Sequence, residues 1–258
     1  MTTYTCGALL SPHNEKDLIA EHVFPKARDL NLPATLDLRP QLQPVRDQGK
    51  QGSCVAQASA CLKEWQEKVQ IGFSEYMSPQ FIYNNRMNQT SEGMYPSNAM
   101  MILFSKGCCT EYVYRYGTIQ PPDQIPQPAY EEAIKYKIGK YARVSTIDGL
   151  KTALNTSGPC LITFPVYNYG ASFWSPAADD KLDGYHCVTV VGYTAIGFII
   201  RNSWGKNWNK DGYTIYPYTD FGKHSELWTA LDTVSPLYVP HPPIPNPDNK
   251  KSKCCTII

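Results

Sequence analysis

The residues best suited to covalent chemistry are a cysteine, a histidine and an asparagine that lie far apart in the chain. Cys54 opens a segment with helical periodicity, His186 enters an apolar strand-like run, and Asn202 ends the next such run. The separations are 186 − 54 = 132 and 202 − 54 = 148 positions. A thiol, an imidazole and a carboxamide with this spacing are typical of enzymes that attack an acyl group with a cysteine.

A helix is predicted to begin at the cysteine. Apolar residues recur every three or four positions, at Val55, Ala58, Leu62, Trp65 and Val69. This pattern predicts a helix from Ser53 to about Gln70, with Ser53 as the N-cap. The positive end of a helix dipole stabilises a thiolate and lowers the pKa of a cysteine placed there. A buried cysteine without a catalytic role is the alternative.

Other periodic segments divide the chain into a helical part and a strand part. Helices are predicted at residues 78–85, 97–106 and 149–154, and strands at 141–144, 160–164, 187–193, 197–202 and 212–216. Helices first and strands second indicate an α+β chain with two subdomains and a cleft between them. We therefore expect a helical subdomain over 32–140 and a β subdomain over 141–235.

Composition excludes several classes of protein. The chain has 258 residues, of which 42% are hydrophobic, and a formal net charge of +1, which gives no electrostatic case for a nucleic-acid partner. No apolar run is long enough to span a bilayer, and the N-terminus does not resemble a secretory signal peptide. Nine cysteines without zinc-site spacing predict no metal, no cofactor and mostly reduced thiols in an intracellular, reducing compartment.

Three segments resemble the papain family of cysteine proteases. The run Gln48–Ala58 is similar to the family's glutamine-glycine and G-S-C segment, and Tyr185–Tyr193 resembles its histidine strand. Residues 199–205 with Trp208 and 212–213 resemble its asparagine segment. The resemblance runs from about Leu32 to about Pro236, and it implies a papain-like fold with a helical left domain and an antiparallel, barrel-like right domain.

The resemblance also assigns roles to particular residues. Cys54 would be the nucleophile, held as a thiolate by the imidazolium of His186, and Asn202 would orient the imidazole. Trp204 would shield the bond between His186 and Asn202 from water. The side-chain amide of Gln48 and the backbone amide of Cys54 would form the oxyanion hole.

A substrate pocket is expected from positions that match the family's main specificity site. These positions are Gly93, Met94, Tyr95, Pro96, Thr163, Tyr185 and Ala230. None is charged, so we expect an apolar residue at the second position before the cleaved bond, as in cathepsin L-like enzymes. Ordinary core packing is the alternative for these residues. The family's disulfide-forming cysteine is replaced by Gln51.

The two ends of the chain do not belong to either subdomain. Residues 1–31 are too short for the family's usual propeptide. This arm would lie in the cleft, with Cys6 pairing with Cys54 as a reversible lock, or pack elsewhere with a free Cys6, which is the more ordinary expectation. Residues 236–258 form a proline-rich tail.

The tail ends in a pattern typical of lipid attachment. Cys255 begins a C-a-a-X prenylation box, Cys254 is a second acylatable cysteine, and lysines precede both. The motif predicts a membrane-anchored protein in a eukaryotic or host cytosol. A tail with chance cysteines is the alternative.

Together these features predict a cysteine endopeptidase that hydrolyses polypeptides through a thioester. A thiol acyltransferase or peptide ligase on the same fold, and a non-catalytic binding protein derived from a protease, are the alternatives. The sequence does not predict an oligomeric state.

Overall fold

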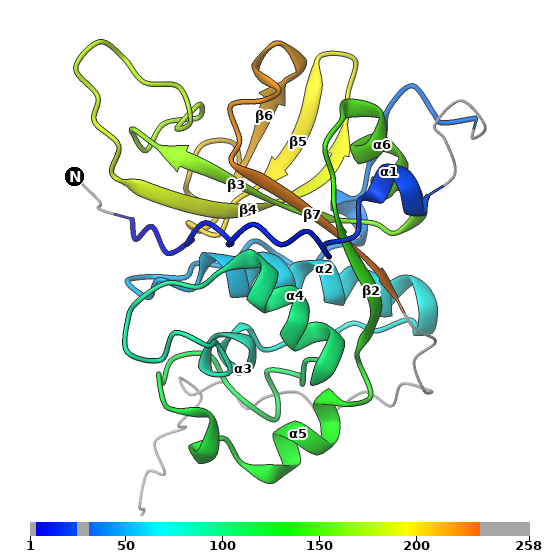
Figure 1. Ribbon diagram of the computed structural model, residues 1–258, viewed down its shortest axis with the longest axis vertical. Coiled ribbons are helices and arrows are strands. Elements are labelled where there is room, and N and C mark those ends of the chain that lie inside the picture. Colours follow the sequence, from blue (N-terminus) through cyan, green and yellow to red (C-terminus); the bar gives the residue numbers. More distant parts are fainter. Residues whose placement is uncertain (1–3, 25–30, 233–258) are drawn as a thin grey trace, which may run out of the picture.

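The computed structural model describes residues 4–24 and 31–232, which form a helical half and a half built on an antiparallel sheet (Figure 1). The helices are α1 Ala20–Val23, α2 Cys54–Ile71, α3 Pro79–Asn84, α4 Pro96–Ser105, α5 Gln127–Ala133 and α6 Ile147–Thr156. Short 3-10 turns lie at Arg39–Gln41, Pro122–Gln124 and Tyr218–Asp220. The predicted α+β class is confirmed.

The sheet contains seven strands. They are β1 Leu36–Asp37, β2 Ile138–Arg143, β3 Cys160–Val166, β4 Gly184–Tyr193, β5 Gly197–Arg201, β6 Tyr213–Pro217 and β7 Glu226–Asp232. The order is β2-β7-β3-β4-β5-β6, with β1 paired to β4, and every pairing is antiparallel. Because α2 packs against β4, the first turn of the helix lies beside the strand that carries His186.

Among the elements of more than four residues, two are absent from the sequence-based prediction, α5 and β7. Strand β7 lies between β2 and β3, so its first five residues are buried on both sides and do not alternate between apolar and polar. From the sequence, this strand was assigned only one expected pocket residue, Ala230. The helix α5 is short and begins among prolines, a context that sequence reasoning assigns to a loop.

The predicted helix after Ser53 is present as α2, but its surroundings differ from the expected ones. The Ser53 hydroxyl makes no cap hydrogen bond and contacts the Tyr116 hydroxyl at 2.6 Å instead. The apolar face is not continued to the end of the helix, because Val69 is 52% exposed. Polar side chains on the other faces, Lys63 and Glu67 among them, are buried. The helix is therefore surrounded by protein over its first three turns rather than amphipathic.

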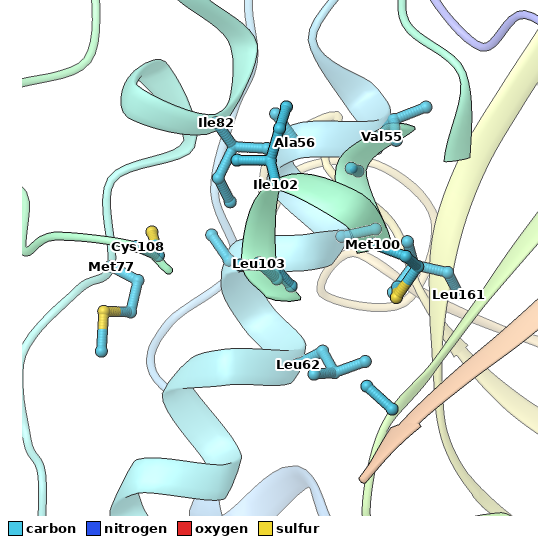
Figure 2. Close-up of a cluster of buried hydrophobic side chains, with 14 of the residues drawn as sticks. Val55, Ala56, Leu62, Met77, Ile82, Met100, Ile102, Leu103, Cys108 and Leu161 are labelled. Carbon is cyan, nitrogen blue, oxygen red and sulfur yellow. The ribbon is translucent and has the colours of Figure 1, made fainter. Parts of the chain in front are cut away.

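Two apolar clusters support the two sides of the chain. The first joins α2, α3 and α4, with Leu62, Ile102 and Leu103 packed between the helices (Figure 2). The second lies under the sheet and includes Phe164 and Trp174. Burial of each such side chain contributes about 1.5–3 kcal/mol. The first cluster also contains Leu161, Cys187 and Ala230 of the sheet, so the helix carrying Cys54 and the strand carrying His186 share one core.

The N-terminal arm, which we define as residues 4–19, runs between the two halves (Figure 1, dark blue). It forms a parallel bridge from Ala8 to Met94 and another from Ile19 to Arg143. An ion pair of 2.7 Å between Arg143 and Asp17 holds its far end. The expectation that the arm packs away from the cleft is therefore wrong, because backbone groups on both sides of the cleft pair with it.

Within residues 4–24 and 31–232, no helix is long and apolar enough to cross a membrane. All seven cysteines of this part of the chain are free thiols, and all but Cys6 are buried. The exact subdomain limits stay a prediction, and the tail after residue 232 lies outside the described residues.

Candidate active site

The first turn of α2 presents Cys54 to the cleft. A tight turn with Gly49 at a φ of 59° precedes the helix, and Cys54 is its first residue. The thiol is fully buried. Its sulfur accepts a hydrogen bond of 3.5 Å from the backbone amide of Cys187. The backbone amide of Gly7 also faces the sulfur and lowers the pKa of Cys54. One donor thus comes from β4 and the other from the arm.

His186 immediately precedes Cys187, the residue whose amide donates to this sulfur. Its Nε2 is 2.7 Å from Oδ1 of Asn202. A carbonyl oxygen accepts, so the neutral ring carries its proton on Nε2 and leaves Nδ1 as the basic nitrogen. Nδ1 is buried without a hydrogen-bond partner among the described residues. This nitrogen is the one available for the cysteine proton.

Aromatic rings enclose the imidazole. The ring of Trp204 stacks on His186 with centroids 4.3 Å apart, and Tyr4 of the arm stacks on Trp204 at 4.7 Å. Phe173 meets the imidazole edge-on at 5.9 Å. The predicted shield is thus placed over the histidine, and the enclosing rings lower the local dielectric around the bond to Asn202.

Gln48 lies buried just before the nucleophile. Its Oε1 accepts a hydrogen bond of 2.7 Å from the Ser203 hydroxyl, which directs Nε2 into the cleft. Nε2 donates to the Gln51 carbonyl and to the Thr5 carbonyl of the arm, each at 3.0 Å. A carbonyl of the protein's own chain therefore already occupies the predicted oxyanion donor.

The arm pairs with the cleft through its backbone. The amide of Met94 donates to the Gly7 carbonyl at 2.8 Å, and the amide of Leu9 donates to the Met94 carbonyl at 2.9 Å. The amide of Ala8 donates to the Tyr185 carbonyl at 3.0 Å. Met94 belongs to the helical half and Tyr185 to the sheet half, so these bonds hold the arm as an extended peptide across the cleft.

Several predicted pocket residues belong to the same buried cluster as Ala8. Met94 and Ala230 are members of it, and Tyr185 packs against it. Among the remaining positions, Gly93 approaches the Gly7 carbonyl, Thr163 pairs across the sheet with Cys187, and Tyr95 and Pro96 start α4. The cluster that contains Ala8 consists of apolar residues.

Burial changes the protonation of the catalytic pair. It raises the pKa of Cys54 to about 11, against the lowering effect of the amides that face its sulfur. It lowers the pKa of His186 to about 4, although the bond to Asn202 acts in the opposite direction. With the arm in place, burial therefore favours a neutral thiol and a neutral imidazole, because buried charges lose their hydration. The thiolate–imidazolium pair stays a prediction for the open enzyme.

Three residues of the site were missed in the sequence. Ser203 orients Gln48, Cys187 donates its amide to Cys54 and lines the cluster around Ala8, and Phe173 packs on His186. Ser203 and Cys187 each adjoin a predicted site residue, which is a signal that could have found them. Phe173 lies in an irregular loop with no such signal. In residues 4–24 and 31–232 no cluster of side chains is suited to a metal ion.

This combination of a helix-borne cysteine, a histidine fixed by an asparagine and a side-chain amide donor defines an enzyme that attacks acyl groups with a thiol. Residues 32–224 match the family model described as papain family cysteine protease. The chain belongs to the papain family, and it is a cysteine-type peptidase with the papain-like fold expected from its sequence.

Individual relatives agree with this membership. An uncharacterized peptidase C1-like protein, L477, of Acanthamoeba polyphaga mimivirus is 31% identical over 255 residues, which cover 87% of this chain and 79% of the relative. Papain of Carica papaya is 26% identical over 80% of this chain and 61% of its own length. The crystal structure of xylellain, a cysteine protease from Xylella fastidiosa, has a TM-score of 0.77 and 28% identity, and the match covers 88% of this chain and 96% of that one.

Proposed function

We propose that the protein is a cysteine endopeptidase that is kept latent by its own N-terminal arm. The observation that carries this proposal is the extended peptide already bound in the cleft. Its Thr5 carbonyl accepts from Gln48, and its backbone pairs with Met94 on one wall and Tyr185 on the other. A cleft that holds the middle of a chain in this way is suited to internal peptide bonds.

The catalytic cycle follows from the placement of the side chains. When the arm leaves, water and substrate enter, and Nδ1 of His186 takes the proton of Cys54. The thiolate attacks the substrate carbonyl, whose developing oxyanion is bound by Nε2 of Gln48 and the amide of Cys54. His186 then protonates the departing amine, and a thioester remains on the sulfur. Water activated by the same imidazole hydrolyses it and restores the thiol.

The arm blocks the cleft without serving as a substrate. The group of Gly7 that faces the Cys54 sulfur is its amide N–H, a donor to sulfur rather than a carbonyl carbon open to attack. The arm pairs with Met94 through Ala8, and the two segments run in the parallel direction. The buried thiol is also protonated at neutral pH, because its pKa is raised to about 11. These features support an arm that stays intact while it covers the nucleophile.

An apolar residue at the second position before the cleaved bond is the preference we infer. The pocket that now holds Ala8 is formed by apolar side chains, among them Met94, Cys187 and Ala230. The carboxylate of Glu226, which acts electrostatically on Cys187, accepts a hydrogen bond of 2.7 Å from the Trp228 indole and pairs with Arg143 at 3.6 Å. A basic residue in this pocket would therefore lose its hydration without gaining a free counter-charge.

The test uses full-length protein carrying Gly7→Ala, a change that displaces the arm, with and without Cys54→Ala. We expect cleavage of fluorogenic peptides with Leu or Val at the second position, and labelling of Cys54 by one equivalent of an epoxysuccinyl inhibitor. Peptides with Arg or Asp there should react at least about tenfold more slowly. Absence of both cleavage and labelling in the folded protein rules the function out.

The transferase alternative is separated by the products. In the presence of an added amine, a peptide ligase would yield the amide of the acyl fragment, whereas a hydrolase yields the free acid. We expect the acid to dominate. A non-catalytic role is disfavoured by the intact set of Cys54, His186, Asn202 and Gln48.

Attachment to a membrane through Cys255 and Cys254, and residence in a reducing cytosol, stay predictions, since the tail lies outside the described residues. In a eukaryotic cell, an alkyne-tagged isoprenoid should label the wild-type chain and not the Cys255→Ser variant. An unlabelled wild-type chain contradicts the prediction.

A further inference from the structure

We propose that Cys6 and Cys54 form a reversible disulfide that locks the arm over the nucleophile under oxidising conditions. This inference rests on the proposed function, since it names how the same site is regulated. With this disulfide, inhibition by the arm depends on the redox state of the two cysteines and not only on competition between the arm and the substrate.

The arm is fixed on both sides of Cys6. Immediately before it, the Thr5 carbonyl accepts from Nε2 of Gln48 at 3.0 Å, and immediately after it, the amide of Gly7 faces the Cys54 sulfur. The Gly7 nitrogen is two covalent bonds from the α-carbon of Cys6. Cys6 therefore directly adjoins the residue that faces the nucleophile, and the electrostatic influence of Cys54 reaches its thiol. A disulfide requires the two α-carbons to lie within about 7 Å of each other, and the cross-linking experiment below tests whether the arm reaches that geometry.

The side chain of Cys6 packs against Gly184. A β-carbon added at Gly184 would lie 3.1 Å from the Cys6 β-carbon and 4.0 Å from its sulfur. Because residue 184 is a glycine, that volume is left to the cysteine. Gly7 is similarly required, since a β-carbon there would be 2.1 Å from the Gly52 carbonyl oxygen. The two glycines let the arm that carries Cys6 approach the cleft closely.

Access differs between the two thiols. Cys6 is partly exposed, while Cys54 and the five other cysteines of the described residues are buried. A soluble oxidant therefore meets Cys6 first, and Cys54 is the thiol placed to react next. Burial, and to a lesser degree the electrostatic influence of Cys54, raise the pKa of Cys6 to about 12, so Cys6 reacts slowly with the oxidant.

The chemistry balances with a glutathione disulfide as oxidant. The Cys6 thiolate attacks one sulfur of the oxidised glutathione, forming a mixed disulfide and releasing one glutathione thiolate. Cys54, after giving up its proton, attacks the Cys6 sulfur and releases the second glutathione. The two cysteine protons end on the two glutathione molecules, and the two electrons lost by the protein thiols reduce the glutathione disulfide.

The link changes the energetics of arm release. Without it, the arm leaves when its backbone hydrogen bonds and the Tyr4–Trp204 contact break, and the equilibrium depends on those contacts alone. With it, the arm is tethered to the nucleophile and Cys54 has no free thiol. Release then requires a reductant, so activity should follow the thiol–disulfide balance around the protein.

The test treats full-length protein with oxidised glutathione, blocks remaining thiols with iodoacetamide, and digests it without reduction for mass spectrometry. A tryptic peptide carrying Cys54 also contains Cys61, so the experiment is run in a Cys61→Ala background as well. We expect a Cys6–Cys54 peptide in both proteins, removed by reduction. In Cys6→Ser we expect no cross-link and a glutathione adduct or a free thiol at Cys54.

Activity is measured in parallel on the same samples. We expect the oxidised wild-type protein to lose at least about tenfold in peptide cleavage and to regain it on reduction. Glutathione adducts on Cys6 or Cys54 without a cross-link, or no reaction at all, would overturn the lock. A cross-link in a protein that cleaves nothing when reduced, even with Gly7→Ala added, would instead leave the lock standing and remove the proposed endopeptidase function.

Discussion

At the scale of single residues, the site depends on groups that orient other groups. Asn202 fixes the proton of His186 on Nε2, and the Ser203 hydroxyl holds the Gln48 carboxamide so that its NH₂ faces the cleft. Neither group needs to touch the reacting atoms. The geometry that makes Gln48 an oxyanion donor thus depends on a residue beside the asparagine, 155 positions away in the chain.

We predict that Ser203→Ala lowers kcat while KM is retained. One hydrogen bond to Gln48 is lost, which is worth about 1 kcal/mol and corresponds to roughly a fivefold decrease. Steady-state kinetics of peptide cleavage in the arm-displaced protein measure it. Ser203→Thr keeps a hydroxyl and is the matched control. A change in KM alone, with kcat unchanged, would contradict an orienting role for Ser203.

At the scale of elements, the arm and the first turn of α2 act as one unit. The arm contributes an amide to the Cys54 sulfur, a carbonyl to Gln48 and an apolar side chain to the pocket. Its close approach depends on Gly7, which touches the Gly52 backbone. A side chain at residue 7 would therefore push the arm away from the Gly52 backbone while Cys54, His186, Asn202 and Gln48 stay unchanged.

We predict that Gly7→Ala activates the protein. The added methyl would lie 2.1 Å from the Gly52 carbonyl oxygen, and overpacking of this kind costs about 1–3 kcal/mol, which corresponds to roughly a 5- to 100-fold increase in the open population. Peptide cleavage by full-length protein measures the change. Leu10→Ala, at an arm side chain that is 42% exposed, should leave the rate near that of the wild type. Equal rates for all three folded proteins would mean that the arm does not limit access.

At the scale of the whole molecule, the helical half and the sheet half meet at a cleft, and the arm lies across it. Covering the cleft removes water from Cys54 and His186, which favours their neutral forms. Opening restores water and allows the ion pair. Latency is therefore both a steric and an electrostatic property of the closed molecule.

We predict a difference in thiolate content at neutral pH. A thiol with a pKa of about 11 is deprotonated at pH 7 to only about one part in ten thousand, because 11 − 7 = 4 pH units. Rehydration in Gly7→Ala lowers this pKa, so its thiolate signal should appear several pH units lower than in the wild type. Ultraviolet absorbance of the thiolate, taken as the difference from the matching Cys54→Ala protein, measures it. Indistinguishable titrations would refute the electrostatic part of latency.

We also predict that Lys63 joins the halves energetically. Its ammonium is buried between Glu67 of α2, at 2.5 Å, and Asp232 of β7. Lys63→Met leaves buried carboxylates without their cation, which costs about 3–5 kcal/mol in the free energy of unfolding. Urea denaturation measures the loss. The double variant Lys63→Met, Glu67→Gln should recover part of it, and no recovery would place the cost in packing instead.

The sequence alone determined the class of fold and the chemically active residues. Periodicity after Ser53 places Cys54 at the start of a helix, and the apolar runs that carry His186 and Asn202 form neighbouring strands, because these signals are local. Strand β7 was not recognised, since a strand buried on both faces has no alternation, and the N-cap role of Ser53 was replaced by a contact with Tyr116.

Only the tertiary structure decided where the arm lies and what it does to the site. Residues 4–19 carry little local signal, and their position depends on backbone hydrogen bonds to Met94 and Tyr185, which the chain brings together from different halves. The neutral state of Cys54 and His186 likewise depends on burial, a property of the assembled molecule rather than of any residue. The sequence thus specifies the reacting groups, and the fold determines whether water, and therefore charge, reaches them.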